Sequence, residues 1–218
     1  MPAAGAALSD SVLRFGPEDA EVGVLLMHGL GADAGDLAPV VPHLGRDDWR
    51  FVLPTAPIRP VTINAGWAMP AWYDITSMDR SDPKREVEEH IRAVSFQMET
   101  LMEDEGPSKW VVAGFSQGGA IALHLAWRCE KKLLGVLAMS TYLVLEHTLD
   151  DERSEVNAGT PAMFCHGSED DVVPMARGRH AFDRWNDGRP CRFESYPMAH
   201  SLCLPQVRDI GEWLRSLG

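Results

Sequence analysis

One stretch constrains the fold of this chain more than any other, residues 109–129, which read KWVVAGFSQGGAIALHLAWRC. It opens with a short apolar run, 110–113, of the kind that forms a buried strand. A G-x-S-x-G pentapeptide from Gly114 to Gly118 follows, and apolar residues then recur at mostly helical spacing. A strand, a glycine-flanked serine and a helix, in that order, are the context of a nucleophile elbow centred on Ser116. The simpler alternative is a glycine-rich turn in which the serine only caps the helix.

The glycines around the serine favour the elbow. In so sharp a turn, side chains at Gly114 and Gly118 would clash, and Gly119 lets the helix lie close to the strand. The turn would push the Ser116 hydroxyl out of the sheet edge at the positive end of the following helix, where anionic intermediates are favoured.

Apolar segments typical of strands alternate with helical patterns along the whole chain. The strand-like segments besides 110–113 are 12–15, 22–27, 51–54, 133–139, 161–165 and 191–196. Helical patterns occupy 36–44, a stretch from Asp82-Pro83 to about 105, 174–185 and a final stretch from about Pro205. This alternation predicts a mostly parallel central sheet with helices on both faces. With 218 residues and 45% hydrophobic content, the chain has the size of a single domain spanning 1–218.

Composition excludes several classes of partner. The formal net charge of -12 opposes binding to nucleic acid, and there is no basic cluster to override it. No apolar run approaches the roughly 20 residues of a membrane span, so we expect no stable membrane insertion. The N-terminus lacks the features of a secretory signal, and the four cysteines lack zinc-type spacing. We therefore expect a cytoplasmic protein without a metal; a mature periplasmic form is the alternative.

A long connection at about 55–82 is rich in proline and aromatic residues. It is too apolar for a solvated linker, and long loops of this kind are often functional. One interpretation is a flap-like insertion that lines a hydrophobic pocket, and the other is a satellite core beneath the loop. As substrate-binding residues we predict Trp67, Met69 and Trp72 from this connection, with Val173 from a later loop. For Asp74 we expect a hydrogen bond within the loop.

Reactive side chains follow three of the predicted strands. Ser116 follows one, Asp170 or Asp171 follows the next but one, and His200 follows the last. Sites in such sheets form beyond the carboxyl ends of the strands. A serine hydroxyl needs an imidazole to take its proton, and the imidazole needs a carboxylate to hold its tautomer. The order Ser, Asp, His is that of α/β-hydrolases; spacing alone does not choose between the two aspartates.

An oxyanion hole would complete this site. The loop after 22–27 can aim a backbone N–H at the nucleophile, and Leu30 is the candidate donor there. Gln117, directly after the serine, is the second. We expect His28 to pin this loop rather than act as the base.

The other polar features have structural interpretations. Five other histidines fall on predicted helices or exposed loops and are expected to be structural: His43, His90, His124, His147 and His180. The charged residues at 86–92 are expected to form a solvated helix face, and the acidic piece 146–155 is expected to be an exposed excursion.

Five motifs together resemble one known family. They are HGLGAD from His28, PTAPIRPVTINAGWAMPAWYDI from Pro54, GFSQGGAIAL from Gly114, HGSEDDVVP from His166 and MAHSLC from Met198. The chain resembles, over essentially its whole length, the phospholipase/carboxylesterase group of α/β-hydrolases, which includes acyl-protein thioesterases and bacterial carboxylesterase II.

The resemblance assigns roles to the residues that match those motifs. It implies an α/β-hydrolase fold, Ser116 as nucleophile, His200 as base and Asp170, rather than its neighbour, as the acid. Leu30 and Gln117 match the family's oxyanion donors. No metal or organic cofactor is implied, and the relatives, with the exposed apolar loops, suggest a homodimer.

The leading hypothesis is a serine carboxylesterase that hydrolyses small to medium acyl esters through an acyl-serine intermediate. The alternative keeps the mechanism and changes the substrate: an acyl-protein thioesterase or a lysophospholipase. A binding protein that kept the fold and lost catalysis is a third hypothesis, against which the complete set of candidate residues argues.

Overall fold

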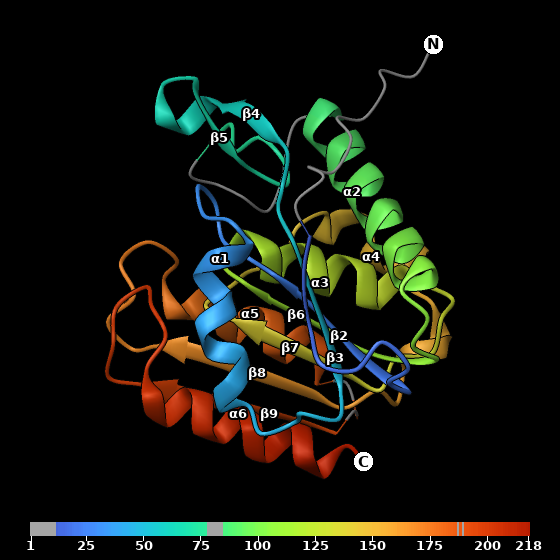
Figure 1. Ribbon diagram of the computed structural model, residues 1–218. Coiled ribbons are helices and arrows are strands. Elements are labelled where there is room, and N and C mark those ends of the chain that lie inside the picture. The colour runs from blue at the N-terminus through green and yellow to red at the C-terminus, as the bar shows by residue number, and fades with distance from the viewer. Residues whose placement is uncertain (1–11, 78–84, 187, 189) are drawn as a thin grey trace.

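The computed structural model describes residues 12–77, 85–186, 188 and 190–218 (Figure 1). The helix start predicted at Asp82-Pro83 and the last part of the predicted flap lie outside these described residues. Among the residues described, no helix combines the length and the apolar character that crossing a bilayer requires.

A seven-stranded sheet, ordered β1-β3-β2-β6-β7-β8-β9, forms the centre of the molecule (Figure 1). Only β1 is antiparallel to its neighbour, and the other pairs are parallel. The strands are β1 (Val12–Phe15), β2 (Val22–Met27), β3 (Arg50–Pro54), β6 (Lys109–Phe115), β7 (Gly135–Met139), β8 (Ala162–Gly167) and β9 (Cys191–Tyr196). This is the mostly parallel α/β architecture that the alternation of apolar strands and helical patterns predicts.

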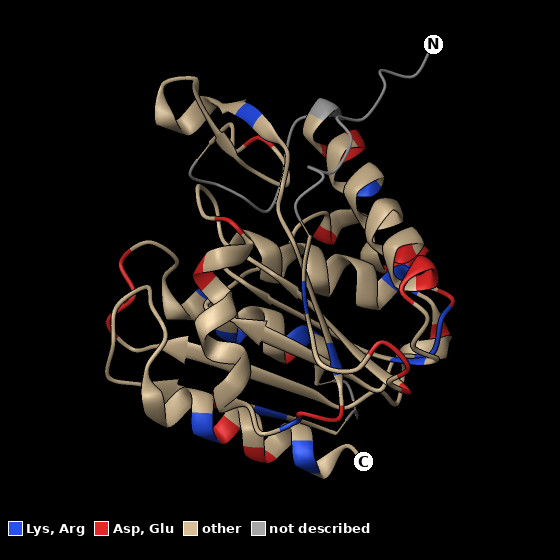
Figure 2. Ribbon diagram, viewed as in Figure 1, with Lys and Arg blue, Asp and Glu red and all other residues tan. Residues whose placement is uncertain are grey.

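Helices cover both faces of this sheet. The longer ones are α2 (Arg85–Asp104), α3 (Gln117–Arg128), α5 (Met175–Trp185) and α6 (Leu204–Ser216), and the short ones are α1 (Ala34–Leu37) and α4 (Leu149–Glu152). Side chains alternate along each strand. In β2, Leu25 and Met27 pack in a core with α2, α3 and α5, whereas Val24 and Leu26 pack with α1 and α6. Figure 2 shows the charges mainly on helices and loops, with few on the sheet.

The prediction of one continuous helix at 36–44 is wrong. The segment forms the short α1 and then a 3-10 helix, η1 (Ala38–His43). Proline occupies positions 39 and 42, and a proline nitrogen has no hydrogen to donate to an α-helical ladder. Asp33 caps α1 by accepting from the Gly35 N–H at 2.6 Å.

A hairpin inside the long connection is the second correction, because no regular structure was predicted there. β4 (Ile58–Val61) and β5 (Trp67–Pro70) pair antiparallel, joined through the 3-10 helix η2 (Thr62–Asn64), and stand clear of the main sheet (Figure 1). Prolines at 60 and 70 obscure a strand pattern but are tolerated in edge strands. The loop role of Asp74 is confirmed, since its carboxylate accepts from Thr62 N at 2.7 Å and Thr62 Oγ1 at 2.6 Å.

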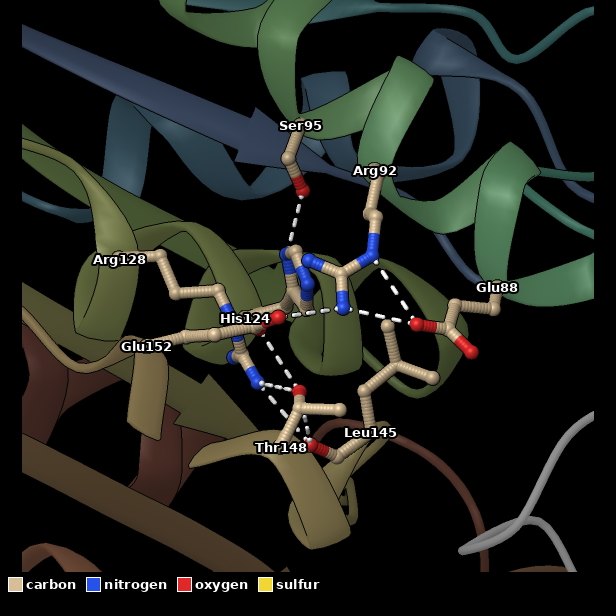
Figure 3. A network of polar contacts seen from close by, with 8 residues as sticks. All are labelled: Glu88, Arg92, Ser95, His124, Arg128, Leu145, Thr148 and Glu152. Carbon is tan, nitrogen blue, oxygen red and sulfur yellow. Dashed lines mark hydrogen bonds and ion pairs between the residues drawn. The ribbon is translucent and has the colours of Figure 1, made fainter. Parts of the chain in front are cut away.

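The acidic piece 146–155 is exposed only in part, because it also packs on the core. It forms η3 (Glu146–Thr148), α4 and the start of η4 (Glu155–Asn157). Leu149 is 3% exposed. Glu88 and Arg92 on α2 were predicted to face solvent, but Arg92 Nη2 lies 2.8 Å from Glu88 Oε1 and 2.7 Å from Glu152 Oε1 (Figure 3). The side of α2 that carries Glu88 and Arg92 therefore docks partly on α4, whereas Glu89 is exposed as predicted.

Glu152 is the centre of this network (Figure 3). Its Oε2 accepts from Arg128 Nε and from Thr148 Oγ1, both at 2.7 Å. Arg128 Nη2 also donates to the Leu145 carbonyl at 3.0 Å. Burial tends to raise the pKa of Glu152, but hydrogen bonds from Arg92, Arg128 and Thr148 outweigh it and lower the pKa to about 2. The network ties α2, α3 and α4 together.

We expect Glu152→Gln to lower the free energy of unfolding by about 1–2 kcal/mol at pH 7, because two guanidinium groups lose their shared counter-charge. The folded-state pKa lies below 4.5, so the carboxylate's contribution is complete above pH 4.5 and is lost as the pH falls towards 2. Urea unfolding at pH 7 and pH 3 should therefore show a difference between variant and wild type that shrinks on acidification. Glu212→Gln, at an exposed position on α6, is the control; an equal loss in both variants would contradict the prediction.

Candidate active site

Ser116 occupies a strained turn between β6 and α3. Its backbone has φ 54° and ψ -117°, a region that residues with side chains rarely adopt. The turn is held by Ser116 N–H donating to the Met139 carbonyl at 2.9 Å and by Thr141 Oγ1 donating to the Ser116 carbonyl at 2.6 Å. These two hydrogen bonds keep the Ser116 backbone in its strained conformation. The residue is 6% exposed.

Three glycines make the turn sterically possible, as the sequence indicated. A Cβ at Gly114 would overlap the backbone of Gly118, and a Cβ at Gly118 would overlap the Met27 carbonyl. A Cβ at Gly119 would lie 2.7 Å from Thr141 Cβ. Strand, turn and helix therefore have the geometry of a nucleophile elbow.

The structure brings Ser116, His200 and Asp170 into one chain of hydrogen bonds. His200 Nε2 lies 2.9 Å from Ser116 Oγ, and His200 Nδ1 lies 2.7 Å from Asp170 Oδ2. Since the ionised carboxylate can only accept, the partners assign the proton to Nδ1 and leave Nε2 free to accept from the serine. This is the arrangement needed for Ser116 to lose its proton to His200.

Asp170 is held on every side. Its side chain is 0% exposed, and Oδ1 accepts from Val172 N at 3.0 Å and from Val173 N at 2.7 Å. His166 Nε2 donates to the Val173 carbonyl at 2.8 Å and supports the same loop. Asp171, which spacing alone could not distinguish from Asp170, is exposed.

Leu30 and Gln117, the predicted oxyanion donors, both line the cavity next to Ser116. Gln117 is the first residue of α3, where backbone N–H groups have no acceptor within the helix. Neither backbone N–H has an acceptor within the described part of the chain. A Cβ at Gly29 would lie 3.4 Å from Ser116 Cβ, so the loop that carries Leu30 packs against the nucleophile.

His28 pins this loop, as predicted, and is not paired with the serine. It is 1% exposed, its Nδ1–H donates to the Gly29 carbonyl at 2.6 Å, and its Nε2 accepts from Ala56 N–H at 3.0 Å. Burial lowers the pKa of His28, which keeps the ring neutral. A neutral ring is what these two opposite hydrogen-bond roles require.

A cavity of about 620 Å³ opens at Ser116 and His200. Its wall is mostly apolar: Leu30, Leu37, Val40, Ile63, Ile75, Phe115, Tyr142, Val172 and Leu202. The polar wall includes Asp36, Asn64 and Ser201. Within the described ranges, no group of three or more His, Cys, Asp or Glu side chains is placed to hold a metal ion.

The predicted substrate-binding residues are corrected by the structure. Trp72 and Val173 are 0% exposed and belong to the core, so neither side chain faces the cavity. Neither Trp67 nor Met69 is among the residues that line the cavity: Trp67 is 74% exposed on β5, and Met69 Sδ lies 3.3 Å from Nδ2 of the lining residue Asn64. The flap-like connection does contribute to the cavity, but through Ile63, Asn64 and Ile75.

Tyr142 and Val172 are wall residues that sequence reasoning missed. A positional signal existed for Tyr142, because it follows β7 at the carboxyl edge of the sheet, where sites form. No sequence signal distinguishes Val172, which is 47% exposed, from the fully buried Val173 beside it. Both valines donate a backbone N–H to Asp170 Oδ1. The turn that these bonds close leaves the Val172 side chain at the cavity and the Val173 side chain in the core.

Comparisons with known proteins identify relatives over nearly the whole chain. Residues 13–217 match the model of the family described as Phospholipase/Carboxylesterase. Acyl-protein thioesterase 1 of Cryptococcus neoformans is 32% identical, covering 93% of this chain and 95% of that protein. The Neurospora crassa acyl-protein thioesterase 1 is 34% identical, with 88% and 84% covered. The crystal structure of Zea mays acyl-protein thioesterase 2 superposes with a TM-score of 0.85 at 25% identity, covering 95% of this chain and 99% of that one.

A strained elbow serine, a histidine and a buried aspartate meet beside an apolar cavity. They do so on a mostly parallel sheet shared with these relatives. The chain therefore belongs to the phospholipase/carboxylesterase family of α/β-hydrolases and is a serine hydrolase that acts on esters or thioesters.

Proposed function

We propose that this enzyme is an acyl-protein thioesterase, which cleaves fatty acyl thioesters through an acyl intermediate on Ser116. The observation that carries the proposal is the hydrogen-bonded chain of Ser116, His200 and Asp170 at the mouth of an apolar cavity. The leading hypothesis from the sequence was a carboxylesterase for small to medium acyl esters. The names of the relatives favour the alternative, so the carboxylesterase becomes the second candidate.

In the acylation step, Ser116 Oγ attacks the carbonyl carbon as His200 Nε2 takes the hydroxyl proton. The carbonyl oxygen becomes an anion that accepts from the N–H groups of Leu30 and Gln117, and each such donor contributes about 3 kcal/mol. Asp170 holds the His200 tautomer and stabilises the imidazolium. The carbon–sulfur bond then breaks, and the imidazolium proton passes to the leaving sulfur.

Deacylation repeats the same steps with water. His200 takes a proton from a water molecule, which attacks the acyl-serine carbon, and the second anion occupies the same oxyanion hole. The carbon–Oγ bond breaks, Ser116 regains its proton from His200, and the carboxylic acid leaves. Apart from the substrate and this water, both half-reactions use only groups of this chain.

The apolar wall supports an acyl chain as the bound part of the substrate. A cavity of about 620 Å³ is within the usual range for small-molecule sites. Each buried methylene contributes about 0.8 kcal/mol, which corresponds to about fourfold in kcat/KM. The acyl chain length at which kcat/KM stops rising therefore measures how far the cavity extends.

The test is a panel of thioesters and oxygen esters matched in acyl length. We expect kcat/KM to rise by up to about fourfold per methylene until the cavity is filled, with each thioester exceeding its ester. Ile63→Ala should flatten the rise, because Ile63 lines the cavity, whereas Ile58→Ala, at an exposed hairpin residue, should not. A preference for short oxygen esters would instead favour the carboxylesterase.

Several sequence predictions remain predictions about the setting. We propose a cytoplasmic enzyme that acts without a cofactor, does not bind nucleic acid or insert stably into a membrane, and forms a homodimer. The net charge of -12 supports the absence of nucleic-acid binding.

A further inference from the structure

Trp72 is fully buried, yet its indole makes a hydrogen bond beside the site. Nε1–H donates to the His28 carbonyl at 2.8 Å, and the indole ring lies 5.0 Å from the His28 ring. His28 begins the loop that carries Leu30. The contact therefore joins the base of the flap-like connection to one half of the predicted oxyanion hole.

The side chain of Gln117 grips the same segment from the other half. Its Oε1 accepts from the Trp72 backbone N–H at 2.9 Å, and its Nε2 donates to the Tyr73 carbonyl at 2.8 Å. The Gln117 side chain is buried, and the residue is 0% exposed. One residue thus supplies a backbone donor to the cavity and anchors residues 72 and 73 with its amide.

Three successive peptide units of the Leu30 loop are each pinned. The His28 carbonyl accepts from the Trp72 indole, the Gly29 carbonyl accepts from the His28 ring at 2.6 Å, and Gly31 N–H donates to the Pro70 carbonyl at 2.9 Å. The peptide unit that carries the Leu30 N–H is the middle one. It cannot rotate without breaking a bond of its own or disturbing an anchored neighbour.

We propose that residues 70–73 form a brace that sets the two oxyanion donors relative to each other, with Trp72 and the amide of Gln117 as positioning residues. The inference rests on the proposed function of the site. Oxyanion donors are effective only when they are held in place before charge develops. The brace contacts both donor-bearing segments: the bonds of Trp72 and Gln117 are buried, and the bond from Gly31 N–H to the Pro70 carbonyl lies nearer the surface.

The chain contains a matched control for Trp72. Trp110 is also 0% exposed, and its indole Nε1–H donates to the Pro107 carbonyl at 2.9 Å. It lies near the amino end of β6, whereas Ser116 follows the carboxyl end. Trp72→Phe and Trp110→Phe therefore each remove one buried indole hydrogen bond, but only the first lies beside the site.

The experiment compares these two variants by thermal unfolding, by kcat and KM on p-nitrophenyl butyrate, and by inhibition with an alkyl boronic acid. The boronic acid bonds to the serine oxygen and places an anionic oxygen in the oxyanion hole. For Trp72→Phe we expect kcat to fall by about tenfold or more, but by less than the fall in kcat that removal of a whole oxyanion donor causes. KM should change little. Boronate affinity should fall by the same factor. Trp110→Phe should show a similar drop in Tm and neither kinetic effect.

Gln117→Met is the second variant, in case Trp72→Phe does not fold. Methionine makes neither of the amide's hydrogen bonds to Trp72 N–H and the Tyr73 carbonyl and adds no charge beside the oxyanion hole, and we expect the same paired loss of kcat and boronate affinity. Wild-type kcat and boronate affinity in the folded variants, or equal losses in Trp110→Phe, would overturn the brace. The proposed function has a separate test: it would fail if the Ser116→Ala variant kept wild-type activity.

Discussion

Ser116→Ala is expected to lower kcat by about 10⁴-fold to 10⁶-fold while the protein stays folded. The hydroxyl oxygen is the atom that lies 2.9 Å from His200 Nε2, and no other described group makes that contact. Without it, the acyl intermediate cannot form, and the residual rate comes from binding and the oxyanion donors alone. Release of p-nitrophenol and labelling by a fluorophosphonate probe both measure the loss.

Ser201→Ala is the matched control, because Ser201 lines the same cavity but its hydroxyl donates to the Leu202 carbonyl at 3.4 Å. It should retain near wild-type activity and labelling. Ser116→Gly adds a second readout: glycine adopts positive φ freely, so we expect an inactive protein about 1 kcal/mol more stable than wild type. Labelling that persists in Ser116→Ala would show that another residue is the nucleophile.

Asp170→Asn should lower kcat by on the order of 10⁴-fold with little change in KM. In the wild type, Oδ1 accepts two backbone N–H groups and Oδ2 faces His200 Nδ1. An asparagine would keep its oxygen towards the two N–H groups and turn its NH₂ towards the imidazole. Nδ1 would then accept, the proton would move to Nε2, and His200 could not take the serine proton.

Asp171→Asn makes the same chemical change one residue away. Asp171 is exposed, so this variant should keep its activity. Steady-state kinetics on one ester, with Tm values to show that both variants fold, decide the comparison. Equal activity in the two variants would remove Asp170 from the mechanism.

The local parts of the site could be predicted because they depend on near neighbours in sequence. The elbow needs glycines within three positions of Ser116, since a Cβ there meets backbone atoms of the same turn and of β2. The order of Ser116, Asp170 and His200 after three strands sufficed to predict their meeting, because parallel strands deliver their carboxyl ends to one edge. The resemblance then separated Asp170 from Asp171, as the structure does by burying only the first.

The cavity wall could not be predicted in the same way. Trp72 looked like a pocket aromatic, but its indole is used inside the protein, on a carbonyl 44 positions away. Val172 and Val173 are chemically identical, and only the turn around Asp170 decides which one faces outward. The ion pairs of Glu152 with Arg92 and Arg128 likewise join segments 60 and 24 positions apart, which no local pattern reveals.

The sequence by itself determined the alternation of strands and helices, the sharp turn at Ser116 and the order of the reactive side chains, since periodicity and glycine sterics act over a few residues. The tertiary structure decided which side chains line the cavity and how residues 70–73 hold Leu30 and Gln117. Those outcomes depend on hydrogen bonds between segments that only the folded sheet brings together. A side chain such as Trp72, whose polar group is hydrogen-bonded in the interior, does not line the cavity.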